Sequence, residues 1–174
     1  MSNTQPRDAG LAPAGMAGRL NEPRVSALTP YVHVADVERS LAFYRLLGFS
    51  VDSRHPAPLA AGGSATRTVW ASASCGGARI MFALASGRVD PATQAVLFYV
   101  HTKDLAGLRG HLLASGVTDA GEYDPESPAR RSALWGTASA AGLVSTIRRP
   151  FYMPEGEMRV EDPDGYTLLV GQVG

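Results

Sequence analysis

Apolar and polar residues alternate in a pattern that occurs twice along the chain. The first copy is Tyr31-Val32-His33-Val34-Ala35-Asp36-Val37, and the second, 68 residues later, is Tyr99-Val100-His101-Thr102-Lys103-Asp104-Leu105. The alternation predicts a strand, because successive side chains of a strand point to opposite faces. In both copies an aspartate then precedes apolar residues at helical spacing, and a glycine, Gly48 or Gly116, follows them. Aspartate is a favoured N-cap and glycine a favoured stop, so we interpret each copy as a strand–helix unit that is duplicated.

Further alternating segments follow each copy and predict a module of one strand, one helix and three strands. A Gly76-Gly77 pair and the run Asp162-Pro163-Asp164-Gly165 are typical of hairpin turns. Residues 56–65 read as a loop, and residues 133–144 suit a short helix that their glycines disfavour. The predicted strands are residues 26–35, 49–53, 66–72 and 78–84 in the first module, and 96–101, 117–123, 156–161 and 166–170 in the second.

Length and composition fit one domain made of these two modules. Of the 174 residues 45% are hydrophobic, which is enough for a core. We place module one at residues 27–90 and module two at 94–173, within a domain of 27–174. The formal charge is zero and no basic block occurs, so neither nucleic acid nor a membrane surface is indicated as a partner. Cys75 is the one cysteine, which excludes an internal disulfide and suits the cytoplasm.

Two segments do not fit the repeat. Residues 1–26 are rich in Ala, Gly and Pro, which predicts a flexible tail, with an arm that packs on a partner subunit as the alternative. Residues 124–149 form a long insert rich in Ser, Ala, Gly and Arg, and it contains Trp135. Long loops inside compact domains are usually functional lids or disordered inserts. A large aromatic in such a loop suggests a lid over a binding cleft or a contact in a dimer.

Two stretches resemble the vicinal oxygen chelate superfamily, which includes glyoxalase I, extradiol dioxygenases, fosfomycin-resistance enzymes and bleomycin-resistance proteins. One is Leu28 to Phe49, with Ser40-Leu41-Ala42-Phe43-Tyr44 and Leu47-Gly48-Phe49, and the other is Gly156 to Tyr166, with its Asp-Pro-Asp-Gly-Tyr turn. The resemblance covers residues 26–172 apart from the insert. It implies an α+β fold in which two βαβββ modules form a curved mixed sheet with a central cleft.

In the metal-dependent members of this family, each module supplies two metal ligands. The resemblance places those ligands at Thr29, Met81, Leu97 and Leu169. Leucine has no donor atom, methionine only a soft sulfur and threonine a weak hydroxyl, whereas Zn, Ni, Mn or Fe need imidazole or carboxylate ligands. We therefore expect neither a metal nor another cofactor, and the chain is closest in character to the metal-free bleomycin-resistance-like branch.

His33 and His101 lie four residues beyond these ligand positions, so strand alternation predicts that they face the same cleft. In glutathione-using relatives the position of His33 is an arginine that contacts the charged end of the substrate. These histidines are our candidates for ligand hydrogen bonding or acid–base catalysis. A structural histidine that bonds a loop carbonyl is an equally good interpretation. A two-histidine metal site is a weaker one, because it lacks an obvious carboxylate partner, although Glu155, Glu157 and Glu161 lie in the appropriate half of the chain.

Four aromatic residues complete the predicted ligand-binding set. Tyr31 and Tyr99 lie on the same strand faces as the histidines, Trp70 lies within a strand, and Trp135 lies in the insert. We predict metal-independent binding of an aromatic or amphipathic small molecule, of the kind that sequesters drugs and confers antibiotic resistance, by a homodimer. The alternative is a glyoxalase- or dioxygenase-type enzyme that uses displaced metal ligands or, without a metal, the histidines as acid and base.

Overall fold

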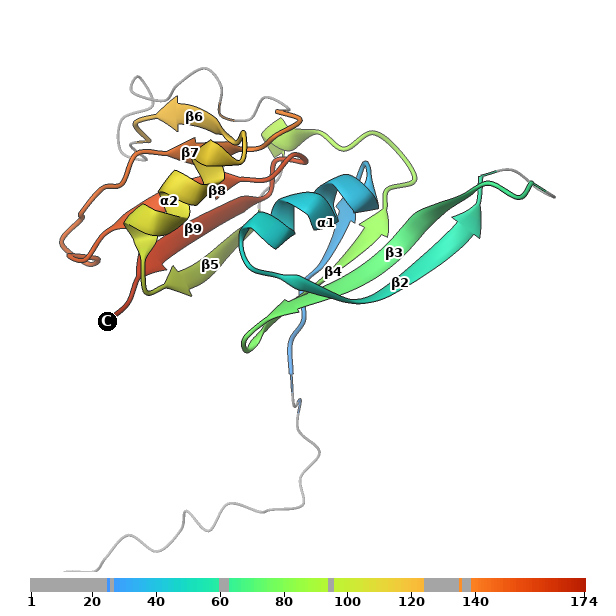
Figure 1. The fold of residues 1–174 in the computed structure, drawn as a ribbon, viewed down its shortest axis with the longest axis horizontal. Coiled ribbons are helices and arrows are strands. Elements are labelled where there is room, and N and C mark those ends of the chain that lie inside the picture. The colour runs from blue at the N-terminus through green and yellow to red at the C-terminus, as the bar shows by residue number, and fades with distance from the viewer. Residues whose placement is uncertain (1–24, 26, 60–62, 94–95, 124–134, 136–138) are drawn as a thin grey trace, which may run out of the picture.

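The computed structural model describes residues 25, 27–59, 63–93, 96–123, 135 and 139–174. In this part of the chain the strands form two sheets, of four and five strands, and each sheet carries one helix (Figure 1). This arrangement confirms the predicted α+β fold class. The predicted tail and most of the predicted insert, including the start of the considered helix at 133–144, lie outside the described residues.

The first sheet has the strand order β1-β4-β3-β2. Strand β1 pairs in parallel with β4, and the other neighbours are antiparallel. The β3–β4 turn contains Gly76, which has a φ of 56°. The elements of this half are β1 Tyr31–Val34, α1 Val37–Leu46, β2 Ser50–Pro58, β3 Thr66–Cys75 and β4 Ala78–Leu84.

The second sheet has the order β5-β9-β8-β7-β6, with β5 parallel to β9 and β8 antiparallel to both of its neighbours. A short 3₁₀ helix, η1 Pro91–Thr93, precedes this half. The elements of this second half are β5 Leu97–Thr102, α2 Leu105–Ala114, β6 Thr118–Gly121, β7 Leu143–Ser145, β8 Glu157–Glu161 and β9 Thr167–Gln172.

The repeated sequence produces the same local geometry in both halves. The Asp36 carboxylate accepts a hydrogen bond from Arg39 N at 3.1 Å, and the Asp104 carboxylate accepts one from Gly107 N at 2.8 Å. Gly48 and Gly116 follow the helices with φ values of 89° and 91°. Both ends have the Schellman pattern, in which the amide beyond the glycine reaches back to the helix. The predicted caps and stops are therefore confirmed.

Two segments differ from the prediction. Strand β2 extends to Pro58, although residues 56–65 were expected to form a loop. Proline is tolerated there because β2 is an edge strand and the pairing register shifts between His55 and Pro56. Residues 143–145, at the end of the segment that suits a helix, instead form strand β7. This strand lies between β6 and β8, so the second module has one strand more than the predicted βαβββ unit.

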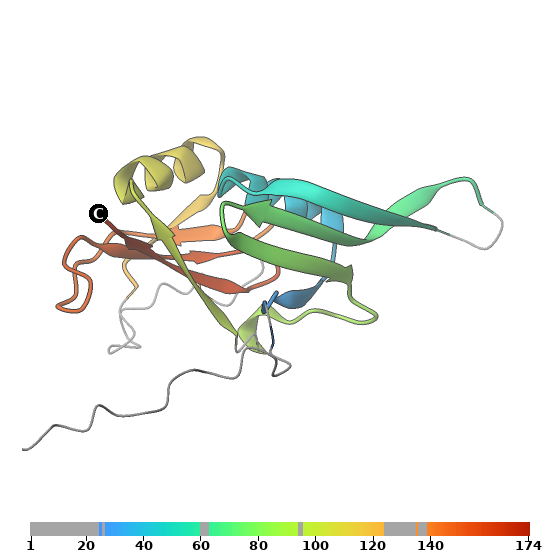
Figure 2. The same cartoon turned by 90° about the horizontal axis from the view of Figure 1, so that it is seen from below.

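Each sheet has one face that packs against a helix and the apolar core, and an opposite face that carries no helix among the described residues. Both helices lie on the same side of the strands (Figures 1 and 2). On β1, Val32 and Val34 are buried toward the helix, whereas Tyr31 and His33 are exposed on the opposite side. We call the opposite side of each sheet its open face. None of the helices in the described part of the chain is long and apolar enough to cross a membrane.

The β8–β9 turn joins the two halves, because its acidic residues bond to the start of α1. Asp164 is buried and accepts hydrogen bonds from Ala35 N at 2.9 Å, Arg39 Nη2 at 2.8 Å and Ser40 Oγ at 3.2 Å. Asp162 is buried beside it and accepts a hydrogen bond from the Tyr44 hydroxyl at 3.4 Å. One continuous apolar cluster, drawn from α1, α2 and both sheets, surrounds this joint.

Candidate functional site

The open face of the first sheet carries three of the predicted site residues. Tyr31 on β1 is 52% exposed, and its ring lies edge-on to His33 with centroids 5.6 Å apart. Tyr31 pairs with Met81 on β4, and His33 pairs with Ala83, which pairs in turn with Trp70 on β3. Paired residues of neighbouring strands project to the same side of a sheet. The structure therefore places Tyr31, His33 and Trp70 together on one surface, with Trp70 half-buried.

The open face of the second sheet repeats this arrangement on β5. Tyr99 is 43% exposed, and its ring lies 5.1 Å from the ring of His101 in an edge-on geometry. Tyr99 pairs with Leu169 on β9, and His101 pairs with Gly171. Burial raises the pKa of the Tyr99 hydroxyl, and the nearby carboxylate of Glu157 raises it further. The phenol is thus neutral at physiological pH and able to donate a hydrogen bond.

Within one chain the two histidines line separate hollows. His33 borders a hollow of about 480 Å³ together with residues 85–90 and Tyr166. His101 borders one of about 370 Å³ with Tyr99, and the thiol-bearing residue Cys75 also lines it. Within one chain, therefore, neither of these two hollows is lined by both His33 and His101. Their joint action in one cleft stays a prediction.

The four positions that the superfamily resemblance marks as metal ligands fall on or beside these open faces. Met81 and Leu169 pair with Tyr31 and Tyr99, and Leu97 is half-exposed at the start of β5. In the part of the chain that is described, no three or more His, Cys, Asp or Glu residues lie together in a way that suits a metal ion. The donor set at these positions does not fit a divalent transition metal.

A buried carboxylate on β8, Glu157, stands on the same open face as Tyr99. Glu157 pairs with Gly171 of β9, forms an ion pair with Arg148 and accepts a hydrogen bond from the Tyr152 hydroxyl at 3.0 Å. Burial and this hydrogen bond raise the pKa of Tyr152. The second carboxylate oxygen of Glu157 is buried and has no hydrogen-bond partner among the described residues.

Two residues further along β8, Arg159 lies beneath two aromatic rings. Its guanidinium carbon is 4.3 Å from the centroid of the Tyr123 ring and 5.1 Å from that of Trp135. Its Nη2 donates to Thr167 Oγ1 at 2.8 Å and lies 3.4 Å from the Glu161 carboxylate. Trp135 thus packs on the open face of its own second sheet.

Sequence reasoning considered Glu157 and Glu161 only as carboxylate partners of a two-histidine metal site and did not select Arg159. The information was present in the run Glu157-Met158-Arg159-Val160-Glu161, in which charged and apolar residues alternate. Alternation alone predicts charged groups on one face of the strand. It does not predict that Glu157 and Glu161 are buried, because that depends on Arg148, Tyr152 and the rings above Arg159.

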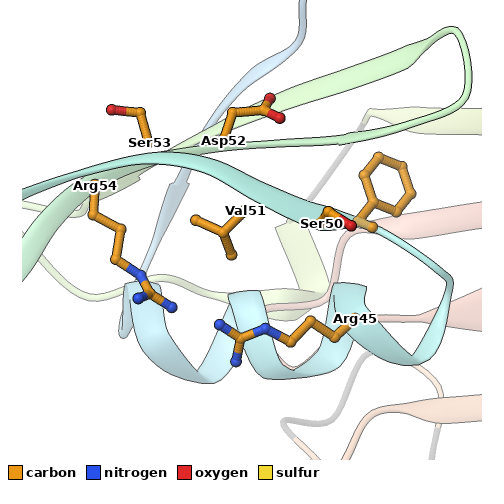
Figure 3. Close-up of a pocket in the computed structure, with 7 residues that line it drawn as sticks. Arg45, Ser50, Val51, Asp52, Ser53 and Arg54 are labelled. Carbon is orange, nitrogen blue, oxygen red and sulfur yellow. The ribbon is translucent and has the colours of Figure 1, made fainter.

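A further hollow, of about 510 Å³, lies on the helix side of the first sheet. Figure 3 shows the Arg54 side chain extending from β2 toward α1 and the Arg45 side chain extending along α1 toward Arg54, whereas Asp52 and Ser53 point away from the helix. Arg54 forms an ion pair with Glu38 of α1 at 3.3 Å. None of the predicted site residues lines this hollow, so we take the open faces as the candidate site.

Comparison with known proteins gives one family and a consistent fold. The family model described as the glyoxalase/bleomycin resistance protein/dioxygenase superfamily matches residues 27–170. No curated protein resembles the sequence closely enough to count as a relative.

Among solved structures, a bleomycin-binding protein complexed with bleomycin is 19% identical with a TM-score of 0.57, over 86% of this chain and all of that one. A bleomycin resistance determinant encoded on transposon Tn5 is 20% identical with a TM-score of 0.54, over 85% of this chain and 98% of that one. The bleomycin-binding protein from Streptomyces verticillus, complexed with copper(II)-bleomycin, is 15% identical with a TM-score of 0.54, over 88% and 100% of the two chains. At these identities the likeness concerns the fold.

Proposed function

Because the chain belongs to the glyoxalase/bleomycin resistance protein/dioxygenase superfamily, we propose that it binds an aromatic or amphipathic small molecule without a metal ion. The supporting observation is the chemistry of the open faces. Each presents a half-exposed tyrosine beside a histidine, Tyr31 with His33 and Tyr99 with His101, next to positions that carry no metal-binding donor set. Flat rings supply contact area, and hydroxyl and imidazole groups orient a ligand by hydrogen bonds.

We propose further that two copies of the chain form the complete site. The two tyrosine–histidine pairs lie on different sheets, and the hollows beside them are separate within one chain. A second copy supplies the wall opposite each open face. Exposed apolar residues around the start of β5 form a surface that the second copy would bury. Leu28 is 92% exposed, and Val96 and Leu97 are each 51% exposed.

Isothermal titration of the full chain with metal-free bleomycin and with 2-acetylnaphthalene tests the binding proposal. We expect saturable binding of at least one probe, and at least tenfold weaker binding after Tyr99→Ala or His101→Ala. His111→Ala is the matched control, because this exposed histidine lies in the last turn of α2. If neither probe binds, the proposal fails.

The metal content of the purified protein tests the proposal that binding requires no metal ion. Protein purified without a chelator is expected to carry no stoichiometric transition metal. One equivalent of metal that is lost in His33→Ala or His101→Ala but kept in His111→Ala overturns this part and favours an enzyme of the superfamily's metal-dependent type.

Sedimentation equilibrium tests the dimer. We expect a mass of about twice 18.3 kDa, and dissociation after Leu97→Glu. Leu59→Glu is the control, because Leu59 is 56% exposed at the end of β2, away from β5. A mass of 18.3 kDa for the unchanged chain contradicts the dimer.

A further inference from the structure

Two buried hydrogen-bond donors on neighbouring side chains have no partner among the residues that the structure describes. They are the Nε of Arg159 and the Nε1 of Trp135. The guanidinium carbon lies 5.1 Å from the centroid of the tryptophan ring, so the two side chains are in contact. A buried donor without an acceptor destabilises a folded protein, and native structures rarely leave one. Two such donors at one place indicate that an acceptor from outside the chain binds there.

The surroundings of these donors are flat and aromatic. The Tyr123 and Trp135 rings are 5.5 Å apart at 72°, and both lie over the Arg159 guanidinium. The donors themselves are buried, but the Arg159 side chain keeps 17% of its surface exposed, and both aromatic side chains are half-buried. The exposed parts of these rings thus offer stacking surface to a planar molecule beside the donors.

The charges at this place are already balanced. The Glu161 carboxylate lies 3.4 Å from Arg159 Nη2, and the neighbouring Glu157 forms an ion pair with Arg148. A bound carboxylate or phosphate would therefore meet two buried carboxylates without a surplus of positive charge, and like charges repel strongly where water is excluded. This balance favours an uncharged acceptor over an anion.

We propose that Arg159 and Trp135 together bind an uncharged carbonyl oxygen at the edge of a planar aromatic ligand, such as an aryl ketone, an aryl amide or a quinone. A carbonyl oxygen has two lone pairs and accepts from both donors at once. This inference rests on the proposed binding function and specifies the ligand class of the second sheet's open face.

Three probes of nearly equal shape test the inference: 2-acetylnaphthalene, 2-naphthoate and 2-ethylnaphthalene. We expect the ketone to bind about tenfold more tightly than the other two, which is the range of hydrogen bonds to a charged group. In Trp135→Phe, which keeps a ring and removes the N–H, and in Arg159→Lys, this preference should disappear. Arg45→Lys is the matched control, because Arg45 is exposed on α1.

Nuclear magnetic resonance of ¹⁵N-labelled protein supplies a readout that does not depend on affinity. The chain has two tryptophans, and the indole signal absent from the Trp135→Phe spectrum belongs to Trp135. The ketone should shift this signal, and 2-ethylnaphthalene should not produce the same shift.

Three outcomes overturn the inference while the binding function stands: preference for 2-naphthoate, equal affinity for all three probes, or ketone binding that leaves the indole signal unmoved. The last result would mean that solvent satisfies the donors. If none of the three probes binds and bleomycin does not bind either, the proposed function fails, and the inference fails with it.

Discussion

The buried carboxylate of Asp164 accepts three of the hydrogen bonds that join the two halves, and its removal should destabilise the protein strongly. The side chain of Asp164 is 1% exposed and accepts three hydrogen bonds from the start of α1. Asp164→Ala leaves the Ala35 amide without an acceptor in a partly buried position. Ser40 keeps its second hydrogen bond, to Asp36 O at 3.1 Å, and Arg39 is exposed enough to regain water.

The expected cost follows from these contacts. An orphaned donor costs roughly 1–3 kcal/mol when it is buried, and the partly buried Ala35 amide lies in the lower part of that range. Loss of a charge-assisted hydrogen bond adds about 1 kcal/mol when the partner is partly exposed. The carboxylate also lies at the positive end of the α1 dipole, which contributes about 0.5 kcal/mol. We therefore expect Asp164→Ala to lower the free energy of unfolding by about 3 kcal/mol. Asp164→Asn keeps an acceptor for the Ala35 amide, so its cost should be about 1 kcal/mol.

Urea denaturation at pH 7, followed by circular dichroism, measures both losses. Asp119→Ala is the matched control, because Asp119 also pairs with an arginine, Arg109, at 2.7 Å, but is 49% exposed. Exposed pairs contribute at most about 1 kcal/mol. If Asp164→Ala costs no more than Asp119→Ala, the joint does not hold the two halves together in the way described.

Two further predictions concern the same region. Burial, with the adjacent carboxylate of Asp164, raises the pKa of Asp162 to about 7, so the folded state holds this proton more tightly than the unfolded chain does. Stability from this group is therefore lost as pH rises from about 4 to about 7. Asp162→Asn should gain up to about 4 kcal/mol relative to the unchanged chain between pH 4 and pH 8, measured by urea titration. A difference that stays constant with pH contradicts the pKa shift. A Cβ on Gly142 would lie 2.4 Å from the Phe43 ring, and its φ of 78° strains any other residue, so Gly142→Ala should lower the stability measured by thermal unfolding by about 2 kcal/mol or more. Gly110→Ala is the control, because it adds a Cβ in open space on α2 and should stabilise the protein by about 0.5–1 kcal/mol. Equal effects of the two substitutions would contradict the packing of Gly142 against Phe43.

The elements that could be predicted from the sequence are those that short-range chemistry determines. The Asp36 and Asp104 caps and the glycine stops depend on groups within four residues of one another, so one reading of the chain suffices. The strand faces of Tyr31 and Tyr99 follow from alternation for the same reason. In each case the interacting groups are close together in the sequence, and the residue type at the position is one that favours the observed structure.

The parts that were missed depend on long-range contacts. Strand β2 continues through Pro56 because it is an edge strand, and no local pattern reports its place in the sheet. Strand β7 has only three residues and exists through its pairing with β6 and β8. The Arg159 site needs Tyr123 and Trp135 above it, which come from distant parts of the chain. These features could not be predicted because the residues that form them interact with partners far away in the sequence.

The two halves share a framework but differ in what their open faces can do. The first face is lined by Tyr31, His33 and Trp70 and, unlike the second, carries no buried carboxylate among these residues. The second face buries the carboxylates of Glu157 and Glu161 beside arginines, and buried charges are tolerated only where their hydrogen bonds are nearly complete. Against that requirement, three of the four buried side-chain atoms that lack a partner among the described residues lie on this surface, on Arg159, Trp135 and Glu157, and the fourth is Arg39 Nε on α1. A stable fold accepts such exceptions where binding completes them. We therefore expect the second sheet to contribute the larger share of polar recognition, in addition to the hydrogen bonds proposed for His33 on the first sheet.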